Sequence, residues 1–349
     1  MKTSLFKTPL RLAIVGATGL VGETLLALIE ERHWPISSVK LFASESSVGE
    51  VLECGSKPVM VEALTSADFS DVDVAIFAVD NALALEYVPK AVAAGALVVD
   101  NSSAFRYDDE VPLVVPEVNG ELLANMPPKG IIANPNCSTV QLAMALKPIV
   151  ETYGVTRINV ATYQSVSGAG KTALEGLVKQ TAALLNAKPV DFAPFTKQMA
   201  FNVIPHIDVF EDNGYTREEM KMVREMQKIY ADPNMLVNPT AVRVPVFYGH
   251  AMAVHVETAK KVNLKRLKTL FGAMPGVKLC DKQIDGGYAT PVSDASGKDD
   301  VYISRLRQDL SSDKGCNLWV VADNLRKGAA LNAAQIVESY LNQRELAGA

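Results

Sequence analysis

A cysteine at a predicted helix start is the strongest chemical signal in the sequence. Cys137 lies in the run Asn134-Pro135-Asn136-Cys137-Ser138-Thr139 and is followed by VQLAMALKPIV, an apolar stretch of helical character. The partial positive charge at a helix N-terminus stabilises a thiolate, which is the nucleophilic form of cysteine. Asn136 or Ser138 is a suitable cap, and free backbone N–H groups there are able to form an oxyanion hole. The other cysteines have no cap and no partner in their flanking sequence and are expected to be buried structural residues: Cys54, Cys280 and Cys316.

Two basic side chains in a later segment suit this nucleophile. Arg243 and His250 lie in RVPVFYGH, a predicted strand followed by a glycine turn, so both are able to face one pocket. A Cys–His pair with a nearby arginine suits acyl transfer from an anionic substrate. The other histidines give weaker signals, because His33 ends a surface-like helix, His255 alternates in a strand and His206 lies in a Pro-containing loop. The sequence leaves open whether the cysteine, histidine and arginine meet.

Other charged residues allow two interpretations. Glu218, Lys221 and Glu225 are spaced i, i+3 and i+7 on a predicted helix, where a solvated face with an ion pair is as good an explanation as a site. Arg106 follows the strand end Asn101-Ser102-Ser103-Ala104-Phe105. It is expected either to face a cleft or to be a surface arginine.

A glycine-rich turn near the start of the chain predicts nucleotide binding. Arg11–Val15 is an apolar run, GATGLVG follows from Gly16 to Gly22, and apolar residues then recur at helical spacing. In such a strand–turn–helix unit Gly16 permits the tight turn, Gly19 lets the backbone approach a pyrophosphate and Gly22 lets the helix pack on the strand. A plain tight turn without a ligand is the alternative.

The end of the second predicted strand bears on the choice of cofactor. An NAD-selective site usually has Asp or Glu there, on the ribose hydroxyls. This chain reads Ala43-Ser44-Glu45-Ser46-Ser47, and its small hydroxylated residues suit a 2′-phosphate better. We therefore expect NADP, with Glu45 either pointing away or weakening that preference.

The order of the predicted elements indicates two domains. Apolar runs at 39–42, 72–79, 96–99 and 131–133 alternate with helical segments such as Leu83–Ala94, which predicts βαβ units and a parallel sheet. After Pro135 the pattern changes to alternating strands at 155–163, 242–246 and 251–258, with helices over 176–186 and 216–231. Thr216 and Glu219 form a predicted capping box. We expect an α/β, Rossmann-like domain over 1–134, completed by a C-terminal helical segment over 325–349, and an α+β catalytic and dimerisation domain over 135–324.

Composition excludes several other classes of protein. The 349 residues are 48% hydrophobic and 21% charged, as in ordinary globular enzymes. The 22 Gly and 18 Pro argue against a coiled coil, and the net charge of −5 without a basic cluster argues against nucleic-acid binding. No membrane span, signal peptide or metal site is expected, because the apolar runs are short and the cysteines are far apart. A reducing cytoplasm is the expected location.

Blocks along almost the whole chain resemble the aspartate-semialdehyde dehydrogenase family. They are GATGLVG, DNSSAFR, VPLVVPEVN, NPNCST, TYQSVSGAG, AFNVIP, DNGYTREEMKM, RVPVFYGH and LWVVADNLRKGAA, in the order of that family. The resemblance implies a nucleophile at Cys137, a general base at His250 and a substrate-holding glutamine at Gln164. It implies an α-carboxylate contact at Arg243, an acidic substrate contact at Glu218, and phosphate contacts at Lys221 and Arg106, with Asn136 near the same pocket.

The same resemblance implies a set of cofactor contacts. They are the pyrophosphate turn with Gly16, Thr18, Gly19, Leu20 and Val21, the 2′-phosphate loop with Ser44 and Ser46, and the nicotinamide contacts Ser167, Gly168 and Asn324. Relatives often carry an arginine among the serines after the second strand, and this chain does not.

The implied reaction is NADPH-dependent reduction of L-aspartyl-4-phosphate to L-aspartate 4-semialdehyde through a cysteine thioester. The implied assembly is a homodimer built on the sheet of the second domain, or a dimer of dimers. Two alternatives stay open at this point: a reductase for another acyl phosphate, such as an N-acetylated glutamyl one, and a non-catalytic nucleotide-binding paralogue.

Overall fold

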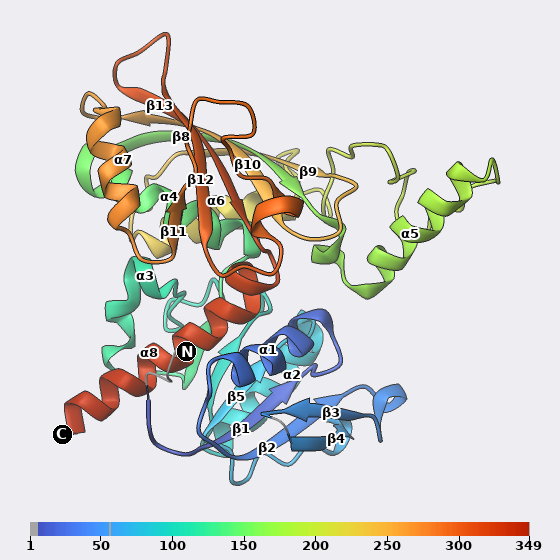
Figure 1. Ribbon diagram of the computed structural model, residues 1–349. Coiled ribbons are helices and arrows are strands. Elements are labelled where there is room, and N and C mark those ends of the chain that lie inside the picture. The colour runs from blue at the N-terminus through green and yellow to red at the C-terminus, as the bar shows by residue number, and fades with distance from the viewer. Residues whose placement is uncertain (1–5, 56, 349) are drawn as a thin grey trace. The chain divides into compact units, whose positions relative to one another are not determined.

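The computed structural model describes residues 6–55 and 57–348. The chain divides into two compact units, and each is described by itself (Figure 1). Unit 1 comprises residues 1–136 and 329–349, and unit 2 comprises residues 137–328. Among the described residues, no helix combines the length and the apolar composition needed to cross a bilayer.

Unit 1 is built on a seven-stranded sheet with the order β3-β4-β2-β1-β5-β6-β7. All its strand pairs are parallel except the β3–β4 hairpin at one edge. The strands are β1 (Leu10–Val15), β2 (Ile36–Ala43), β3 (Val51–Cys54), β4 (Lys57–Ala63), β5 (Val74–Phe77), β6 (Leu97–Asp100) and β7 (Ile131–Ala133). This is the expected α/β, Rossmann-like architecture, and the hairpin is an element that the sequence analysis did not predict.

Within its described residues, unit 1 contains three helices from the first part of the chain and one from its C-terminal end. They are α1 (Leu20–Glu31), α2 (Asn81–Ala93), the single-turn α3 (Pro116–Asn119) and α8 (Leu331–Gly348). The central strands are buried over their whole length, because a parallel sheet is covered on both faces. Residues Leu331, Ile336 and Val337 of α8 share one buried cluster with residues of α1 and β1.

Unit 2 is built on a six-stranded mixed sheet with the order β11-β12-β13-β10-β8-β9. The strands are β8 (Val155–Gln164), β9 (Val237–Arg243), β10 (His250–Thr258), β11 (Val277–Leu279), β12 (Val301–Gln308) and β13 (Gly315–Ala322). Strands near β8, β9 and β10 were predicted from the sequence, and the other three were not. The unit is α+β, as expected.

Helices cover one face of this sheet. They are α4 (Cys137–Tyr153), α6 (Arg217–Ile229) and α7 (Leu264–Ala273), which contact the strands, whereas α5 (Lys171–Leu185) extends away from the sheet (Figure 1). Along β8 and β10 the positions facing these helices are buried, and the alternate ones, such as Asn159, Tyr163 and Ala253, are partly or fully exposed. The period-two pattern in the sequence is the mark of this half-covered sheet.

Several element boundaries differ from the predicted ones. The strand expected over 242–246 is β9, which ends at Arg243, because Pro245 has no N–H to continue a ladder. The helix expected over 176–186 begins earlier, at Lys171. The C-terminal helical segment begins with a π-helical turn over Arg326–Ala330, and α8 follows from Leu331. The capping box of α6 is confirmed, with Thr216 and Glu219 each bonding the backbone of the other.

Candidate active site

The glycine-rich sequence of unit 1 forms a tight turn between β1 and α1. Gly16 has a φ of +86°, and a Cβ there would lie 2.3 Å from the carbonyl oxygen of Ala78. A Cβ on Gly22 would lie 2.3 Å from the carbonyl oxygen of Gly16, so only glycine lets α1 begin this close to the turn. Gly19 is the residue preceding α1, and Leu20 and Val21 form its first turn. The free N–H groups of a helix start therefore follow β1, as the motif predicts.

A pocket of about 430 Å³ lies beside this turn, and Gly16, Thr18, Ser44 and Glu45 are among its lining residues. Glu45 is among these lining residues, and its carboxylate accepts a hydrogen bond from the hydroxyl of Thr65. The Ser44 and Ser46 hydroxyls are 2.9 Å apart, in hydrogen-bond contact. The loop after β2 thus contributes hydroxyl groups and one carboxylate.

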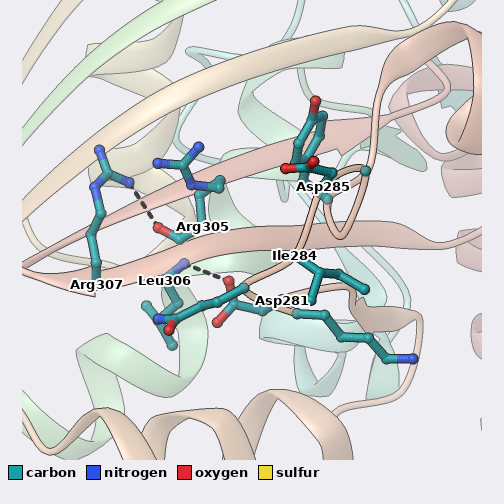
Figure 2. A pocket seen from close by; sticks show the side chains of 10 residues that line it. Asp281, Ile284, Asp285, Arg305, Leu306 and Arg307 are labelled. Atoms are coloured by element: carbon teal, nitrogen blue, oxygen red, sulfur yellow. Dashed lines mark hydrogen bonds between the residues drawn. The ribbon is translucent and has the colours of Figure 1, made fainter.

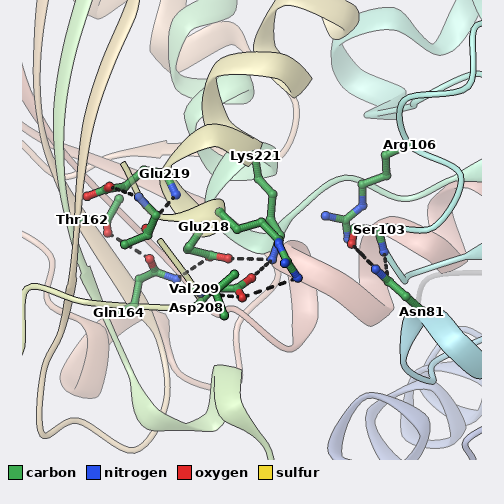
Figure 3. A network of polar contacts seen from close by, with 12 residues as sticks. Asn81, Ser103, Arg106, Thr162, Gln164, Asp208, Val209, Glu218, Glu219 and Lys221 are labelled. Atoms are coloured by element: carbon green, nitrogen blue, oxygen red, sulfur yellow. Dashed lines mark hydrogen bonds and ion pairs between the residues drawn. The ribbon is translucent and has the colours of Figure 1, made fainter. Parts of the chain in front are cut away.

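Arg106 is a buried residue of unit 1, so the alternative of a surface arginine is wrong. Its Nε donates to the carbonyl oxygen of Asn134 at 2.9 Å, and its Nη2 donates to that of Asn101 at 2.7 Å. Asn136, next to Cys137 in the chain, is buried as well. Figure 3 shows Arg106 beside the contact between Asn81 and Ser103.

Cys137 is the first residue of α4 in unit 2. A Cβ on Gly328 would lie 2.9 Å from the Cβ of Cys137, so Gly328 makes room for it. Burial raises the pKa of Cys54 to about 11 and that of Cys316 to about 12, which keeps both as thiols. Cys280 is partly exposed, so its expected burial is only partial. All four cysteines are free.

The register of the sheet gathers several predicted residues at one edge of unit 2. Gln164 pairs with Arg243 in the parallel β8–β9 ladder, and Ala251 pairs with Tyr163 in the antiparallel β8–β10 ladder. The ends of β8 and β9 and the start of β10 at His250 therefore lie together. This brings side chains from distant parts of the sequence close together.

A line of hydrogen bonds runs from β8 to α6 (Figure 3). The Thr162 hydroxyl donates to Gln164 Oε1 at 3.0 Å, and Gln164 Nε2 donates to Glu218 Oε1 at 3.0 Å. Lys221 Nζ then lies 3.0 Å from the other oxygen of Glu218 and 3.1 Å from Asp208. Because Glu218 is buried, the alternative of a solvated helix face is wrong for it.

These charges set the protonation of Lys221. Burial acts to lower its pKa, but the charges of Glu218 and Asp208 outweigh burial and raise it above the ordinary value. Lys221 is therefore a cation within a mostly buried cluster of two carboxylates. Asp208, Thr162 and the line that joins them were not predicted, because single polar residues in loops and strands carry no sequence signal.

Arg243 and His250 both lie next to Gly168. A Cβ on Gly168 would lie 3.2 Å from Arg243 Nη1 and 3.4 Å from His250 Nε2. Burial lowers the pKa of Arg243 below its ordinary value, while attraction to Glu218 and Cys137 opposes this. The charges of Glu218, the predicted acidic substrate contact, and of Cys137, the predicted nucleophile, therefore both act on the guanidinium. Arg243 and His250 thus lie together beside Gly168, and Cys137 is near enough for its charge to act on the pKa of Arg243.

Serine and asparagine side chains support His250. The Ser165 hydroxyl contacts His250 Nδ1 at 3.1 Å, Ser167 Oγ at 3.0 Å and Asn324 Oδ1 at 3.0 Å. Asn324 also accepts from the N–H of Gly249 at 2.9 Å. Ser167, Gly168 and Asn324, predicted as nicotinamide contacts, therefore lie around the histidine. Ser165 was not predicted, although it lies in the motif that holds Ser167.

A larger pocket, of about 540 Å³, lies elsewhere in unit 2 (Figure 2). The loop from Asp281 to Gly286 and the side chains of Arg305 and Arg307 line it. Asp281 accepts from the N–H of Leu306, and Arg307 donates to the carbonyl oxygen of Arg305. No predicted site residue lines this pocket, so size alone does not mark the candidate active site.

Comparisons with known proteins identify the family to which this chain belongs. Residues 11–126 match a family described as semialdehyde dehydrogenase, NAD binding domain, and residues 146–327 match semialdehyde dehydrogenase, dimerisation domain. The aspartate-semialdehyde dehydrogenase of Legionella pneumophila is 53% identical over 336 residues, which cover 96% of each chain. The chain belongs to the aspartate-semialdehyde dehydrogenase family. As a member of that family it is an oxidoreductase, and its dimerisation domain places it among homo-oligomeric enzymes.

Other members of the aspartate-semialdehyde dehydrogenase family agree in sequence and fold. The enzyme of Aquifex aeolicus is 47% identical over 335 residues, covering 95% of this chain and 98% of that one. Aspartate semialdehyde dehydrogenase II from Vibrio cholerae, solved in complex with ASA, has a TM-score of 0.93 at 50% identity and covers 95% of this chain and 98% of that one. The enzyme from Candida albicans, solved with NADP, shares the fold at 23% identity, with a TM-score of 0.74 and 97% and 99% of the chains covered.

Proposed function

We propose that this chain catalyses the NADPH-dependent reductive dephosphorylation of L-aspartyl-4-phosphate to L-aspartate 4-semialdehyde, the step that leads toward lysine, threonine and methionine. The observation that carries the proposal is the position of Arg243, which is buried, pairs with Gln164 across the β8–β9 ladder and lies beside His250 at Gly168. A nucleophile, a cation and a carboxylate in one part of unit 2 suit an acyl phosphate with a free amino-acid end.

Cys137 is the proposed nucleophile. Its thiolate attacks the β-carbonyl carbon, phosphate departs, and a thioester remains. The start of α4 and the positive charge of Arg243 both favour the thiolate. Because acyl phosphates are already activated, the main tasks of the protein are positioning and charge stabilisation.

In the proposed substrate contacts, each charged group of the substrate meets a side chain of opposite charge. Arg243 grips the α-carboxylate, since a guanidinium binds a carboxylate through two parallel N–H bonds. Glu218 takes the α-amino group, and Gln164, which donates to Glu218, holds the substrate beside the cysteine. Lys221, Arg106 and Asn136 are the proposed phosphate contacts, with Lys221 supported by its retained positive charge.

NADP is the proposed cofactor, and residues of unit 1 fit it. The turn at Gly16, Thr18 and Gly19 with the first residues of α1, Leu20 and Val21, would hold the pyrophosphate. Ser44 and Ser46 would hold the 2′-phosphate at the pocket beside this turn. Ser167, Gly168 and Asn324 are proposed to meet the nicotinamide, which when bound supplies a hydride to the thioester carbon.

We further propose a division of labour, an assembly and a location. Residues 1–134 with 325–349 carry the cofactor, and residues 135–324 carry the chemistry and the dimer contact. The assembly is a homodimer or a dimer of dimers, which the match to a dimerisation domain supports. A cytoplasmic location suits an enzyme with a thiol nucleophile and four free cysteines.

An assay in the reverse direction tests the proposal. Purified protein receives L-aspartate 4-semialdehyde and NADP with or without inorganic phosphate, and NADPH formation is followed by absorbance. We expect reduction of NADP that depends on phosphate and is much slower with N-acetylglutamate semialdehyde. Turnover without phosphate, or a preference for the N-acetylated aldehyde, would contradict the proposal. The relatives at 47–53% identity are aspartate-semialdehyde dehydrogenases, so neither alternative is favoured.

A further inference from the structure

The guanidinium of Arg106 is held by two main-chain carbonyl groups at the ends of neighbouring strands. Its Nε donates to the carbonyl oxygen of Asn134, and its Nη2 donates to that of Asn101. Asn101 follows β6 and Asn134 follows β7, and these two strands are paired in parallel. Nε and Nη2 form one edge of the planar guanidinium, so the two carbonyl groups fix its plane. Both acceptors are neutral, so they orient the cation without neutralising it.

The side chains of the same two asparagines bond each other and join the strand ends. Asn134 Nδ2 donates to Asn101 Oδ1 at 2.8 Å and to the carbonyl oxygen of Ala329 at 3.2 Å. Asn101 Nδ2 donates to the carbonyl oxygen of Phe77, the last residue of β5, at 2.7 Å. Each asparagine therefore uses its main-chain carbonyl for Arg106 and its side chain for a neighbour.

A third asparagine, Asn332 on α8, fixes the orientation of the Asn134 amide. It is fully buried, and its Nδ2 donates to Asn134 Oδ1 at 2.6 Å and to the carbonyl oxygen of Val114 at 2.9 Å. Because Asn134 Oδ1 accepts this bond, Asn134 Nδ2 faces Asn101 and Ala329. The bonds thus run in one direction, from α8 through the end of β7 to the end of β6. Reversing one buried amide would leave its neighbours unpaired, which is costly.

A buried carboxylate lies close enough to act on the same cation. The two oxygens of Asp100 accept from the N–H and the hydroxyl of Ser102, at 3.0 and 2.6 Å. Burial raises the pKa of Asp100, and the positive charge of Arg106 opposes this. Asp100 therefore contributes charge to the surroundings of Arg106, whereas the asparagine carbonyl groups set the direction of its guanidinium.

We propose that Asn332 is a positioning residue for Arg106, so that the C-terminal helix sets the direction of the guanidinium that binds phosphate. This deepens the proposed function and rests on it, because Arg106 is one of the proposed phosphate contacts. Recognition of phosphate by arginine depends on the plane of the guanidinium, since paired N–H bonds must reach two oxygens at once. Asn332 acts through Asn134 and has no assigned contact with the substrate.

Steady-state kinetics in the reverse direction test this role. Asn332→Ala removes both donors, and we expect the KM for inorganic phosphate to rise about tenfold, the size of effect that one weakened bond to a charged group gives. The KM values for L-aspartate 4-semialdehyde and NADP should stay within about twofold of wild type. Glu338→Ala is the matched control, because it removes another buried polar side chain of α8, one that bonds Arg32 and Trp34. The control should leave the phosphate KM unchanged.

A double variant shows whether Asn332 acts through Arg106. Arg106→Ala alone should raise the phosphate KM more than Asn332→Ala does. Adding Asn332→Ala to Arg106→Ala should then change this KM by less than about twofold, because the group that Asn332 positions is already gone. Effects of the two substitutions that multiply would overturn the proposal, as would an equal phosphate KM in wild type and Asn332→Ala.

Nitrogen-15 NMR of arginine side chains observes the guanidinium directly and needs no turnover. The Nε–H signal of Arg106 is assigned as the one missing from Arg106→Lys. In wild type this buried, bonded N–H should exchange slowly with solvent, and in Asn332→Ala it should exchange roughly tenfold faster, with no such change in Glu338→Ala. Equal exchange in wild type and Asn332→Ala would overturn the proposal.

A second variant and the wild-type assay complete the test. Asn332→Ser keeps one donor on a shorter side chain and should change the phosphate KM in the same direction if Asn332→Ala does not fold. Failure of both variants to fold, with Glu338→Ala folded, would indicate a purely structural role and overturn the proposal. Wild-type enzyme without phosphate-dependent turnover would instead refute the proposed function, and with it the phosphate contact of Arg106.

Discussion

Arg243 and Cys137 are the main charged groups of the candidate active site in unit 2. The guanidinium is buried, bonds the Ser165 carbonyl and is attracted to both Glu218 and Cys137. A buried cation needs such partners, because the loss of hydration is costly. Changes at either residue should therefore affect the chemistry more than the stability of the fold.

Cys137→Ala should abolish turnover and leave NADPH binding nearly unchanged. The thiol is the proposed point of covalent attachment, whereas the proposed pyrophosphate turn belongs to unit 1. Mass spectrometry after mixing with aspartyl phosphate should show an acyl adduct on wild type and none on the variant. Cys280→Ala, which removes another partly exposed thiol, is the control and should retain both adduct and activity. Activity of the Cys137 variant above roughly a few per cent would exclude a covalent role.

Arg243→Lys should not be a conservative change. An ammonium acts as a point charge and loses the paired N–H geometry of a guanidinium, as well as the contact with Ser165. We expect kcat/KM to fall about 30- to 1000-fold, equivalent to roughly 2–4 kcal/mol of transition-state binding. The exposed Arg266→Lys serves as a control and should behave as wild type. A loss below about threefold would show that Arg243 does not hold the substrate.

At the scale of elements, the loop after β2 decides the cofactor preference. It ends a parallel strand of unit 1, where dinucleotide-binding folds contact the ribose. Its hydroxyl groups suit a 2′-phosphate, but a phosphate usually recruits Arg or Lys, and the segment Ser44–Ser47 carries only the negative charge of Glu45. The preference for NADP should therefore be modest.

Two substitutions in this loop should raise the NADP/NAD ratio of kcat/KM. Ser46→Arg adds a cation, and Glu45→Gln removes a repulsive carboxylate while keeping an acceptor for Thr65. We expect about three- to tenfold from Glu45→Gln and more from Ser46→Arg, through NADP with NAD nearly unchanged.

Both effects should shrink at high salt, because ions screen exposed charges. The exposed Glu53→Gln on β3 is the matched control and should leave the ratio unchanged. If neither loop substitution changes the ratio, the loop does not contact the 2′-phosphate.

At the scale of the whole molecule, the C-terminal helix α8 and the N-terminal strand β1 belong to the same compact unit, unit 1. Glu338 of α8 is buried and accepts from Arg32 Nε at 2.6 Å and from Trp34 Nε1 at 2.8 Å. This contact spans 306 residues of sequence and joins α8 to the segment after α1. Removing one member of a buried pair leaves the other without compensation.

Glu338→Ala should therefore lower the thermal midpoint of unit 1 by several degrees, about 6–12 °C for a loss near 3 kcal/mol. Tryptophan fluorescence reports the transition, because Trp34 is one of the partners. Glu86→Ala, which breaks an exposed pair with Lys90 on α2, should leave the midpoint unchanged. Equal midpoints for wild type and Glu338→Ala would mean that this buried contact does not stabilise unit 1.

The sequence by itself determined the features that depend on neighbours along the chain. The turn at Gly16 and Gly22, the capping box of α6 and the placement of Cys137 at the start of α4 follow from residue types within a few positions. Local sterics and helix-end hydrogen bonding decide such features. The short edge strands β3 and β11 have weak patterns and were missed, and the interior strands β12 and β13 were missed as well.

Only the tertiary structure decided which distant side chains meet. The line from Thr162 through Gln164 to Glu218, the burial of Arg106 and the contact of Ser165 with His250 join residues far apart in sequence. Their positions depend on the register of β8 with β9 and β10, which is set by packing over the whole sheet. The family resemblance pointed to His250, but its contact with the N–H of Ser165 joins residues 85 positions apart, and no sequence pattern reveals it. A hydrogen bond has a direction, and that direction exists only once the chain is folded.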